Sequence, residues 1–196
     1  MLKYLKYKSS SVIMKLVTNR TILEISDSKD AQLILDYYVE NKEHLAPWEP
    51  IRKDSFFTLQ NFSKTLDQNQ QDFKTSSALR FTIFDENRNV VIGVCNFTNI
   101  IYGPFQACNL GYSIAEKYQG MGLMKEALEV AIDYVFEGLN LHRIMANYLP
   151  SNSRSAELLT KLGFEKEGIA KSYLKIAGKW QDHILTSKIN PKHNDY

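Results

Sequence analysis

Cysteine is scarce in this chain of 196 residues, which contains only Cys95 and Cys108. Their spacing fits none of the CxxC patterns that bind metals or catalyse redox exchange, and we expect no metal ion in the functional site. Both cysteines lie in apolar, strand-like surroundings, where a free thiol behaves as a small buried hydrophobe. Two buried thiols predict a reducing compartment rather than a disulfide framework.

The sequence also has no long apolar run. No stretch approaches the roughly 20 apolar residues that a membrane-spanning helix requires. The longest apolar stretch near the N-terminus, Val12-Ile13-Met14, is too short for the core of a signal peptide. We therefore expect a cytoplasmic protein without a membrane partner.

An excess of one charge is missing too, because 24 Lys and Arg stand against 22 Asp and Glu. A net charge of +2 does not indicate a nucleic-acid-binding protein, and we expect no direct DNA binding. The N-terminal segment differs, since five bases precede the first acid, Glu24. They are Lys3, Lys6, Lys8, Lys15 and Arg20. This segment is either a solvated terminus or a contact to an anionic partner, such as the RNA of a ribosome or pre-ribosome.

The length fits one domain. We place it at residues 16–190, because organised hydrophobic patterning begins near Leu16. Residues 1–15 are then a basic N-terminal extension, and residues 191–196 are a tail.

Hydrophobic periodicity predicts an α+β fold, a mixed sheet with helices on both faces. About seven strands are expected, over residues 21–25, 78–84, 90–97, 107–114, 143–148, 164–175 and 179–185. Four helices are expected, from residue 28 to just before Pro47 and over 55–73, 122–137 and 152–163. Between the first two helices, Pro47 and Pro50 predict a loop, because two prolines so close together exclude regular structure.

The most informative stretch is Tyr118-Gln119-Gly120-Met121-Gly122-Leu123-Met124, where a two-glycine loop leads into a long amphipathic helix. Glycine lets a backbone approach a ligand closely, and the free N–H groups at a helix N-terminus bind anions such as a pyrophosphate. A GxxxxGK[ST] nucleotide loop is absent. A dinucleotide loop needs a third glycine and a place after the first strand of a βαβ unit. Coenzyme A is the remaining common pyrophosphate ligand; alternatively, the glycines only form a tight turn.

Several motifs carry a resemblance to a known family. Gln119-Gly120-Met121-Gly122 resembles the Q/R-x-x-G-x-G/A pyrophosphate motif of the GCN5-related N-acetyltransferases (GNAT), with Met124 in place of the final Gly or Ala. Asn152-Ser153-Arg154-Ser155 and Lys161-Leu162-Gly163-Phe164 open and close the next helix as they do in that family. Three further segments resemble the branch that acetylates ribosomal-protein alanine (RimJ-type): residues 47–50, 142–148 and 164–168. The resemblance covers about residues 16–189 and implies the GNAT acyl-CoA N-acyltransferase fold.

The resemblance implies acetyl-CoA as the co-substrate. Backbone N–H groups of residues 119–124 would hold its pyrophosphate, and strand 109–114 would lie along its pantetheine arm. Asn152 would hydrogen-bond the arm, act as a helix N-cap, or do both. The implied cofactor-binding residues are Gly111, Tyr112, Ser113, Ile114, Gln119, Gly120, Met121, Gly122, Leu123, Met124, Asn152 and Ser155.

The catalytic residues are less plain. Many family members place a general-acid Tyr five residues before the Phe of the LGF motif, where this chain has Leu159. The resembling branch can use a helix serine instead, which maps to Ser155; the alternative is a hydroxyl bonded to local backbone. An α-amine has a pKa of about 7.7–8.0, so orientation and a backbone oxyanion donor near residues 112–114 could carry most of the rate. Candidate bases acting through water are Glu49, Tyr112, Asp182 and His183.

The prediction is therefore direct transfer from acetyl-CoA, through a tetrahedral intermediate, to the N-terminal alanine of a ribosomal protein. Two alternatives stay open. The same fold could acetylate a small amine (an amino acid, polyamine or antibiotic). It could also serve as a non-catalytic ribosome-assembly factor, since Leu159 replaces the usual acid and no base is obvious. Trp48, Tyr173 and Trp180 are expected either to line a peptide groove or to pack against the core.

Overall fold

A computed structural model describes residues 14–193. Most of the expected basic extension, including Lys3, Lys6 and Lys8, lies outside the described residues, as do residues 194–196. The other two of the five N-terminal bases, Lys15 and Arg20, pair with acids of the fold. Lys15 Nζ lies 3.2 Å from a Glu24 carboxylate oxygen, and Arg20 Nη2 lies 2.7 Å from Glu126 Oε2.

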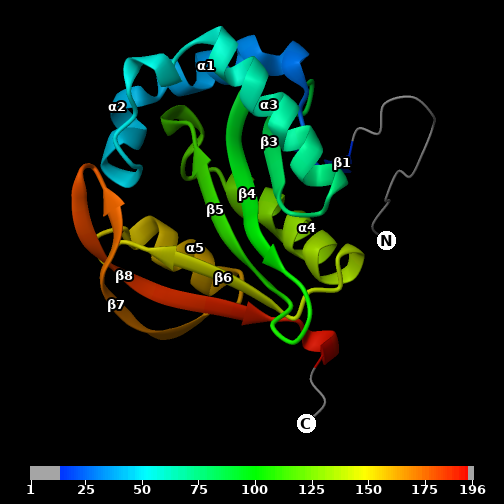
Figure 1. The fold of residues 1–196 in the computed structure, drawn as a ribbon, viewed down its shortest axis with the longest axis vertical. Coiled ribbons are helices and arrows are strands. Elements are labelled where there is room, and N and C mark those ends of the chain that lie inside the picture. The colour runs from blue at the N-terminus through cyan, green and yellow to red at the C-terminus, as the bar shows by residue number, and fades with distance from the viewer. Residues whose placement is uncertain (1–13, 194–196) are drawn as a thin grey trace.

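One eight-stranded sheet runs through the fold in the order β1-β2-β3-β4-β5-β6-β8-β7 (Figure 1). Its strands are β1 (Lys15–Val17), β2 (Thr21–Glu24), β3 (Leu79–Asp85), β4 (Val91–Ile101), β5 (Ala107–Ile114), β6 (Arg143–Tyr148), β7 (Glu165–Ile176) and β8 (Lys179–Ile189). All neighbours are antiparallel except β5 and β6, which are parallel. The mixed sheet is confirmed. The expected seven strands were one too few, because three-residue β1 is too short for alternation to reveal it.

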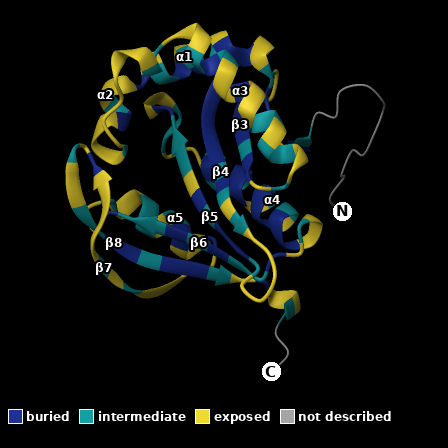
Figure 2. Cartoon of the chain, in the orientation of Figure 1, coloured by how far each residue is buried: buried dark blue, intermediate teal, exposed yellow. Residues whose placement is uncertain are grey.

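Helices cover both faces of this sheet (Figures 1 and 2). α1 (Ala31–Glu40) and α3 (Leu59–Lys74) pack on one side, called here the α1 face. α4 (Leu123–Gly138) and α5 (Ser153–Lys161) pack on the other, the α4 face. None of the helices within residues 14–193 is long and apolar enough to cross a bilayer.

Alternation along the strands divides the core into two clusters. Leu23 and Phe81 belong to the cluster under α4, and Ile22 and Phe84 to the cluster under α1 and α3. Full burial of such a side chain stabilises the fold by about 1.5–3 kcal/mol. A one-residue slip would move each strand's apolar side chains to the wrong face, so burial on both faces fixes the register.

The segment between α1 and α3 differs from the expectation. α2 (Lys42–Leu45) is followed by a 3-10 turn at Ala46–Trp48, so the expected loop is partly helical. Pro47 fits there because the first helical turn needs no N–H from it. α3 begins later than the expected residue 55, because Thr58 caps it by accepting a hydrogen bond from Asn61 N at 3.3 Å.

β5 and β6 separate after a short contact. Their parallel ladder runs only from Ala107 opposite Arg143 to Asn109 opposite Met145. Beyond it, β5 continues to Ile114 and β6 to Tyr148 as the two strands diverge toward α2 (Figure 1). The opening lies beside the N-terminus of α4 and the N-terminus of α5.

Candidate functional site

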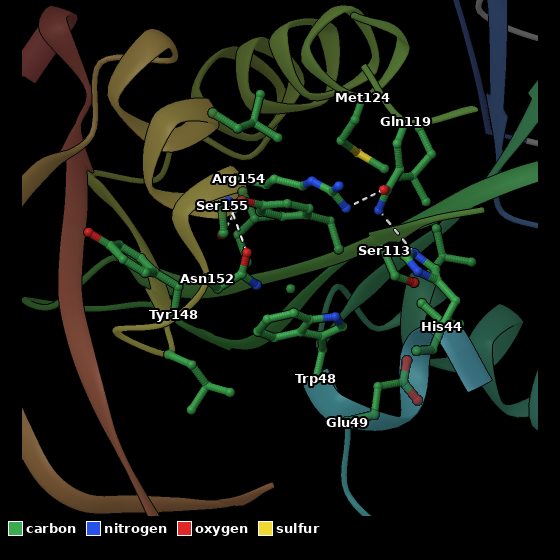
Figure 3. A pocket seen from close by; sticks show the side chains of 18 of the residues that line it. His44, Trp48, Glu49, Ser113, Gln119, Met124, Tyr148, Asn152, Arg154 and Ser155 are labelled. Carbon is green, nitrogen blue, oxygen red and sulfur yellow. Dashed lines mark hydrogen bonds between the residues drawn. The ribbon is translucent and has the colours of Figure 1, made fainter. Parts of the chain in front are cut away.

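A cavity of about 630 Å³ occupies the opening between β5 and β6 (Figure 3). Both faces of the sheet contribute to its wall. Tyr112 and Ile114 pack toward the α4 face, whereas Ser113 turns toward α1, where its Oγ lies 2.9 Å from Tyr37 Oη. The cavity is of the size that proteins use for small-molecule ligands.

The edge of β5 that borders the opening presents backbone donors. At the end of this strand, Ala115 N donates to Ile92 O on the β4 side at 2.9 Å. Backbone N–H directions alternate along a strand, so the N–H groups of Ile114 and Tyr112 point the other way, into the opening. A Cβ added to Gly111 would meet no atom within 4 Å, so this residue borders open space. A ligand can therefore lie against this edge as a neighbouring strand would.

The loop before α4 lies at one end of the cavity. Gly120 and Gly122 have φ values of 74° and 76°, a left-handed conformation that favours glycine. The first intrahelical bond runs from Glu126 N to Gly122 O at 3.1 Å. The preceding N–H groups, of Leu123, Met124 and Lys125, therefore lie at the positive end of the helix dipole. All three residues line the cavity.

Gln119 links the two walls of the cavity. Its amide oxygen accepts a hydrogen bond from Arg154 Nη1 at the start of α5 (Figure 3). Its amide nitrogen lies 3.0 Å from His44 Nε2 in α2. An amide nitrogen can only donate, so His44 Nε2 accepts this bond and its ring proton is on Nδ1. The chain Arg154–Gln119–His44 holds the glycine loop between the two helices.

Arg20 compensates an acid at the same helix end. Its Nε donates to Glu126 Oε2 at 2.8 Å, and its Nη1 donates to the Met121 carbonyl at 3.0 Å. Burial alone would raise the pKa of Glu126, but hydrogen bonds from Thr18 and Arg20, with the Arg20 charge, hold that pKa below its ordinary value. Glu126 is therefore ionised at neutral pH, and Arg20 compensates its charge.

Two hydroxyls meet on the α4 side of the opening. Tyr112 Oη and Ser155 Oγ are 2.6 Å apart. Burial raises the pKa of Tyr112 to about 12, although the hydrogen bond with Ser155 acts against this, so the phenol stays protonated at neutral pH. Ser155 N donates to Asn152 Oδ1 at 3.1 Å, which is the N-cap role expected for Asn152.

On the α1 side the cavity is bordered by the segment after α2. Trp48 and Glu49 line it (Figure 3). Glu49 Oε2 accepts a hydrogen bond from Arg52 Nε at 3.2 Å. The Glu49 carbonyl also accepts from Ala177 N at 2.9 Å, in the turn between β7 and β8. This bond joins the early segment to the closing hairpin across the mouth of the cavity.

The cavity brings together nearly all the residues that the resemblance implied. Of the expected cofactor-binding residues, only Met121 does not line it; its side chain is 53% exposed. The expected catalytic residues Ser155, Tyr112 and Glu49 all line it, with Glu49 on the α1 side. Among the other candidate bases, His183 lines the cavity, whereas Asp182 does not and instead pairs with Lys171 at 2.7 Å.

Sequence reasoning missed several residues that contact the site, among them His44 and Tyr37. His44 and Tyr37 contact residues of the site that are 75 and 76 positions away along the chain. Nothing local in the sequence marks either residue. Of the aromatics expected at a peptide groove, Trp48 lines the cavity, whereas Trp180 is 65% exposed elsewhere on the hairpin.

The fold and the cavity define a class of protein that comparison with known sequences identifies. The family described as "Acetyltransferase (GNAT) domain" matches residues 20–165. The chain therefore belongs to the GNAT acetyltransferase family, whose members use acetyl-CoA. It is an N-acetyltransferase, as the motifs predicted, and the expected GNAT fold is confirmed.

Particular relatives narrow the class. The chain is 46% identical to "[Ribosomal protein uS5]-alanine N-acetyltransferase" of Escherichia coli (strain K12), over 94% of this chain and 95% of that one. The structure of ribosomal-protein-S5-alanine acetyltransferase from Vibrio fischeri superposes with a TM-score of 0.87 at 45% identity, covering 90% of this chain and 97% of that one. Mycobacterium smegmatis RimJ, solved in complex with CoA-disulfide, gives a TM-score of 0.83 at 25% identity, covering 89% and 84%.

Proposed function

We propose that this protein transfers the acetyl group of acetyl-CoA to the α-amine of the N-terminal alanine of ribosomal protein uS5. The observation that carries the proposal is the 46% identity with the Escherichia coli uS5-alanine N-acetyltransferase over 94% of this chain. The cavity supports it, because the N-terminus of α4 lies at one end and the segment of Trp48 and Glu49 lies at the other.

The residues present fit coenzyme A. The pyrophosphate would bind the N–H groups at the start of α4, next to the cations of Lys125 and Arg154. The open space at Gly111 leaves room for the pantetheine arm, which would pair with the β5 edge at Tyr112 and Ile114. Asn152 lies where it can bond the arm while it caps α5.

The acceptor would enter from the α1 face. The bond between the Glu49 carbonyl and Ala177 N narrows this mouth, so an extended N-terminus fits better than a bulky folded surface. Trp48 supplies a flat apolar wall for the first side chain. A small first residue such as alanine suits this space.

The chemistry then needs three groups. The acceptor nitrogen attacks the thioester carbonyl, and the N–H of Tyr112 or Ile114 stabilises the resulting oxyanion. As the carbon–sulfur bond breaks, Ser155 Oγ–H would donate a proton to the leaving thiolate, Tyr112 Oη–H would replace that proton, and a proton lost by the acceptor nitrogen would return to the pair. The transfer requires no metal ion.

The proposal extends to where the protein works. Free Cys95 and Cys108, both buried, are compatible with the reducing cytoplasm. The N-terminal bases Lys3, Lys6 and Lys8 could contact ribosomal or pre-ribosomal RNA, which salt-sensitive co-sedimentation with ribosomes would test.

The test is release of CoA thiol from acetyl-CoA with a panel of acceptors, with mass spectrometry to locate the acetyl group. The panel holds the uS5 N-terminal peptide beginning with Ala, the same peptide with a blocked α-amine, the same peptide beginning with Met, free alanine and spermidine. We expect turnover only with the free Ala-peptide, and no turnover with the blocked one.

Other outcomes point elsewhere. Faster turnover of spermidine or free alanine would contradict the peptide substrate and support the small-amine alternative. Tight acetyl-CoA binding without turnover of any acceptor, including uS5 protein itself, would support a non-catalytic assembly factor.

A further inference from the structure

The α1 face of the last three strands projects side chains into the acceptor end of the cavity. Cross-strand partners lie on the same face, so Asn147 of β6 shares its face with Leu185 of β8, and His183 lies two residues from Leu185. On β7, Leu174 pairs with Gln181, which lies two residues from His183 on β8, so Leu174 is on the same face. Asn147, Leu174 and His183 all line the cavity. His183 is therefore opposite the Tyr112–Ser155 pair, which lies on the α4 side.

His183 is held in one orientation. Its ring is 3% exposed, and its Nδ1 lies 3.1 Å from the Gln181 carbonyl oxygen. A carbonyl can only accept, so Nδ1 carries a proton, and in the neutral form of the ring the lone pair is on Nε2. Within residues 14–193, no hydrogen bond to Nε2 is present. The Tyr173 ring packs against the imidazole at a centroid distance of 5.6 Å, and Asn147 Nδ2 lies 3.4 Å from Tyr173 Oη.

The charged groups around His183 are paired with others. Neighbouring Asp182 points to the opposite face, where its oxygens bind Lys171 Nζ at 2.7 Å and Ser172 N at 2.9 Å. Across the cavity, the Glu49 carboxylate is bound by Arg52. The Tyr173 phenol packs against the imidazole, and Tyr38 lines the same cavity, where burial raises its pKa.

We propose that His183 is the base that accepts a proton from the acceptor's α-ammonium group, directly or through one water. This rests on the proposed function, because it requires an amine entering from the α1 face. His183 lines this wall, its Nδ1 is bound to the Gln181 carbonyl, and no other hydrogen bond to its ring is present within residues 14–193.

The protons balance as follows. The α-ammonium group loses one proton to His183 Nε2, and the neutral nitrogen forms its bond to the thioester carbonyl carbon. The carbon–sulfur bond then breaks, and the thiolate takes a proton from Ser155. The nitrogen then loses a second proton, which restores the hydroxyl protons of the Tyr112–Ser155 pair. His183 releases to solvent the proton that it took from the ammonium group. The amide, the CoA thiol and one proton are the products.

The test compares wild type with His183→Gln across about pH 6–9.5, which spans the ordinary titration range of imidazoles and α-amines. At pH 7 we expect kcat/KM for the Ala-peptide to fall on the order of 10²-fold, with unchanged Kd for acetyl-CoA. The loss should shrink about six- to tenfold by pH 9.5, because the acceptor amine then arrives neutral without help. Exogenous imidazole should partly restore His183→Gly.

One variant serves as a control. His142→Gln removes a histidine that stacks on His193 outside the cavity. This variant should keep the wild-type acid limb of the pH profile.

The outcomes separate cleanly. A loss in His183→Gln that is equal at every pH and is not restored by imidazole would overturn the proposal in favour of a packing role. An unchanged rate would also overturn it. Failure of wild type to acetylate the Ala-peptide would instead contradict the proposed function; the same pH comparison on whichever amine is turned over would then decide the role of His183.

Discussion

Tyr112 Oη lies 2.6 Å from Ser155 Oγ, which joins the strand bordering the opening to the helix beside it. This distance is typical of a strong O–H···O hydrogen bond. Either hydroxyl can donate, so a proton given up by Ser155 can be replaced from Tyr112 without rearrangement of the backbone. Leu159, which occupies the position of the usual acid, is buried in the core under α4.

The first prediction concerns this pair. Ser155→Ala should lower kcat on the order of 10²-fold with little change in KM for acetyl-CoA, because the thiolate loses its proton donor. Tyr112→Phe should lower kcat by a smaller factor. The double variant should have the same kcat as Ser155→Ala, since the two hydroxyls act as one unit. Steady-state kinetics of the four proteins measures this. Thr160→Ala removes another α5 hydroxyl, bonded to Ala156 O at 2.9 Å, and should leave kcat unchanged. Fully additive losses would contradict the relay.

The second prediction concerns the glycine loop. Gly122→Asp should weaken acetyl-CoA binding on the order of 10²-fold, about 2.7 kcal/mol, because it adds a negative charge at the pyrophosphate. Calorimetric titration measures the Kd. Gly103→Asp is a matched control, since Gly103 has nearly the same φ, 75°, and its Cβ would meet nothing within 4 Å. If both variants bind acetyl-CoA equally well, the assignment of the anion site is wrong.

The third prediction concerns Arg20 and Glu126. Arg20→Gln leaves the Glu126 carboxylate uncompensated at the positive end of α4 and should raise the Kd for acetyl-CoA about tenfold. Adding Glu126→Gln should restore most of the affinity, because the repulsive charge is then gone. Titration of the three proteins at low and high salt checks this. No recovery in the double variant would mean that Arg20 acts through the Met121 carbonyl instead.

The fourth prediction concerns stability at acid pH. The folded protein holds the pKa of Glu126 below its ordinary value, so the unfolded chain binds more protons in this range. The stabilisation is therefore complete above about pH 4.3, the ordinary pKa of Glu, and is lost as pH falls through the lowered one. Thermal unfolding between pH 3 and 6 should show a smaller drop in Tm for Glu126→Gln than for wild type. Parallel curves for the two proteins would contradict it.

The sequence predicted the elements that carry strong local patterns. β5 and β6 have the predicted bounds, 107–114 and 143–148, because each alternates clearly between polar ends. Gly122 is the N-cap of α4, which starts one residue after the predicted beginning at 122. The sequence did not reveal β1, because three residues are too few to show alternation. Pro47 was interpreted as part of a loop, although proline also suits the first turn of a helix.

The candidate site also has a part that the sequence predicts and a part that it does not. The proposed cofactor loop consists of contiguous residues, so a motif reveals it. The partners of that loop do not: Arg20 reaches Met121 and Glu126 across about a hundred positions, and His44 reaches Gln119 across 75. Such pairs depend on how the sheet twists and where α2 ends, which only the folded chain determines.

The separation of β5 from β6 also bears on the order of events. If the donor binds at the α4 face and the acceptor enters from the α1 face, as proposed, neither has to leave before the other arrives. Both would then occupy the protein together, and the acetyl group would cross in one step without resting on a side chain. Initial-rate lines at several fixed acceptor concentrations should therefore intersect rather than run parallel. An acetylated N-terminus can also depart through its own mouth while spent coenzyme is still bound at the other.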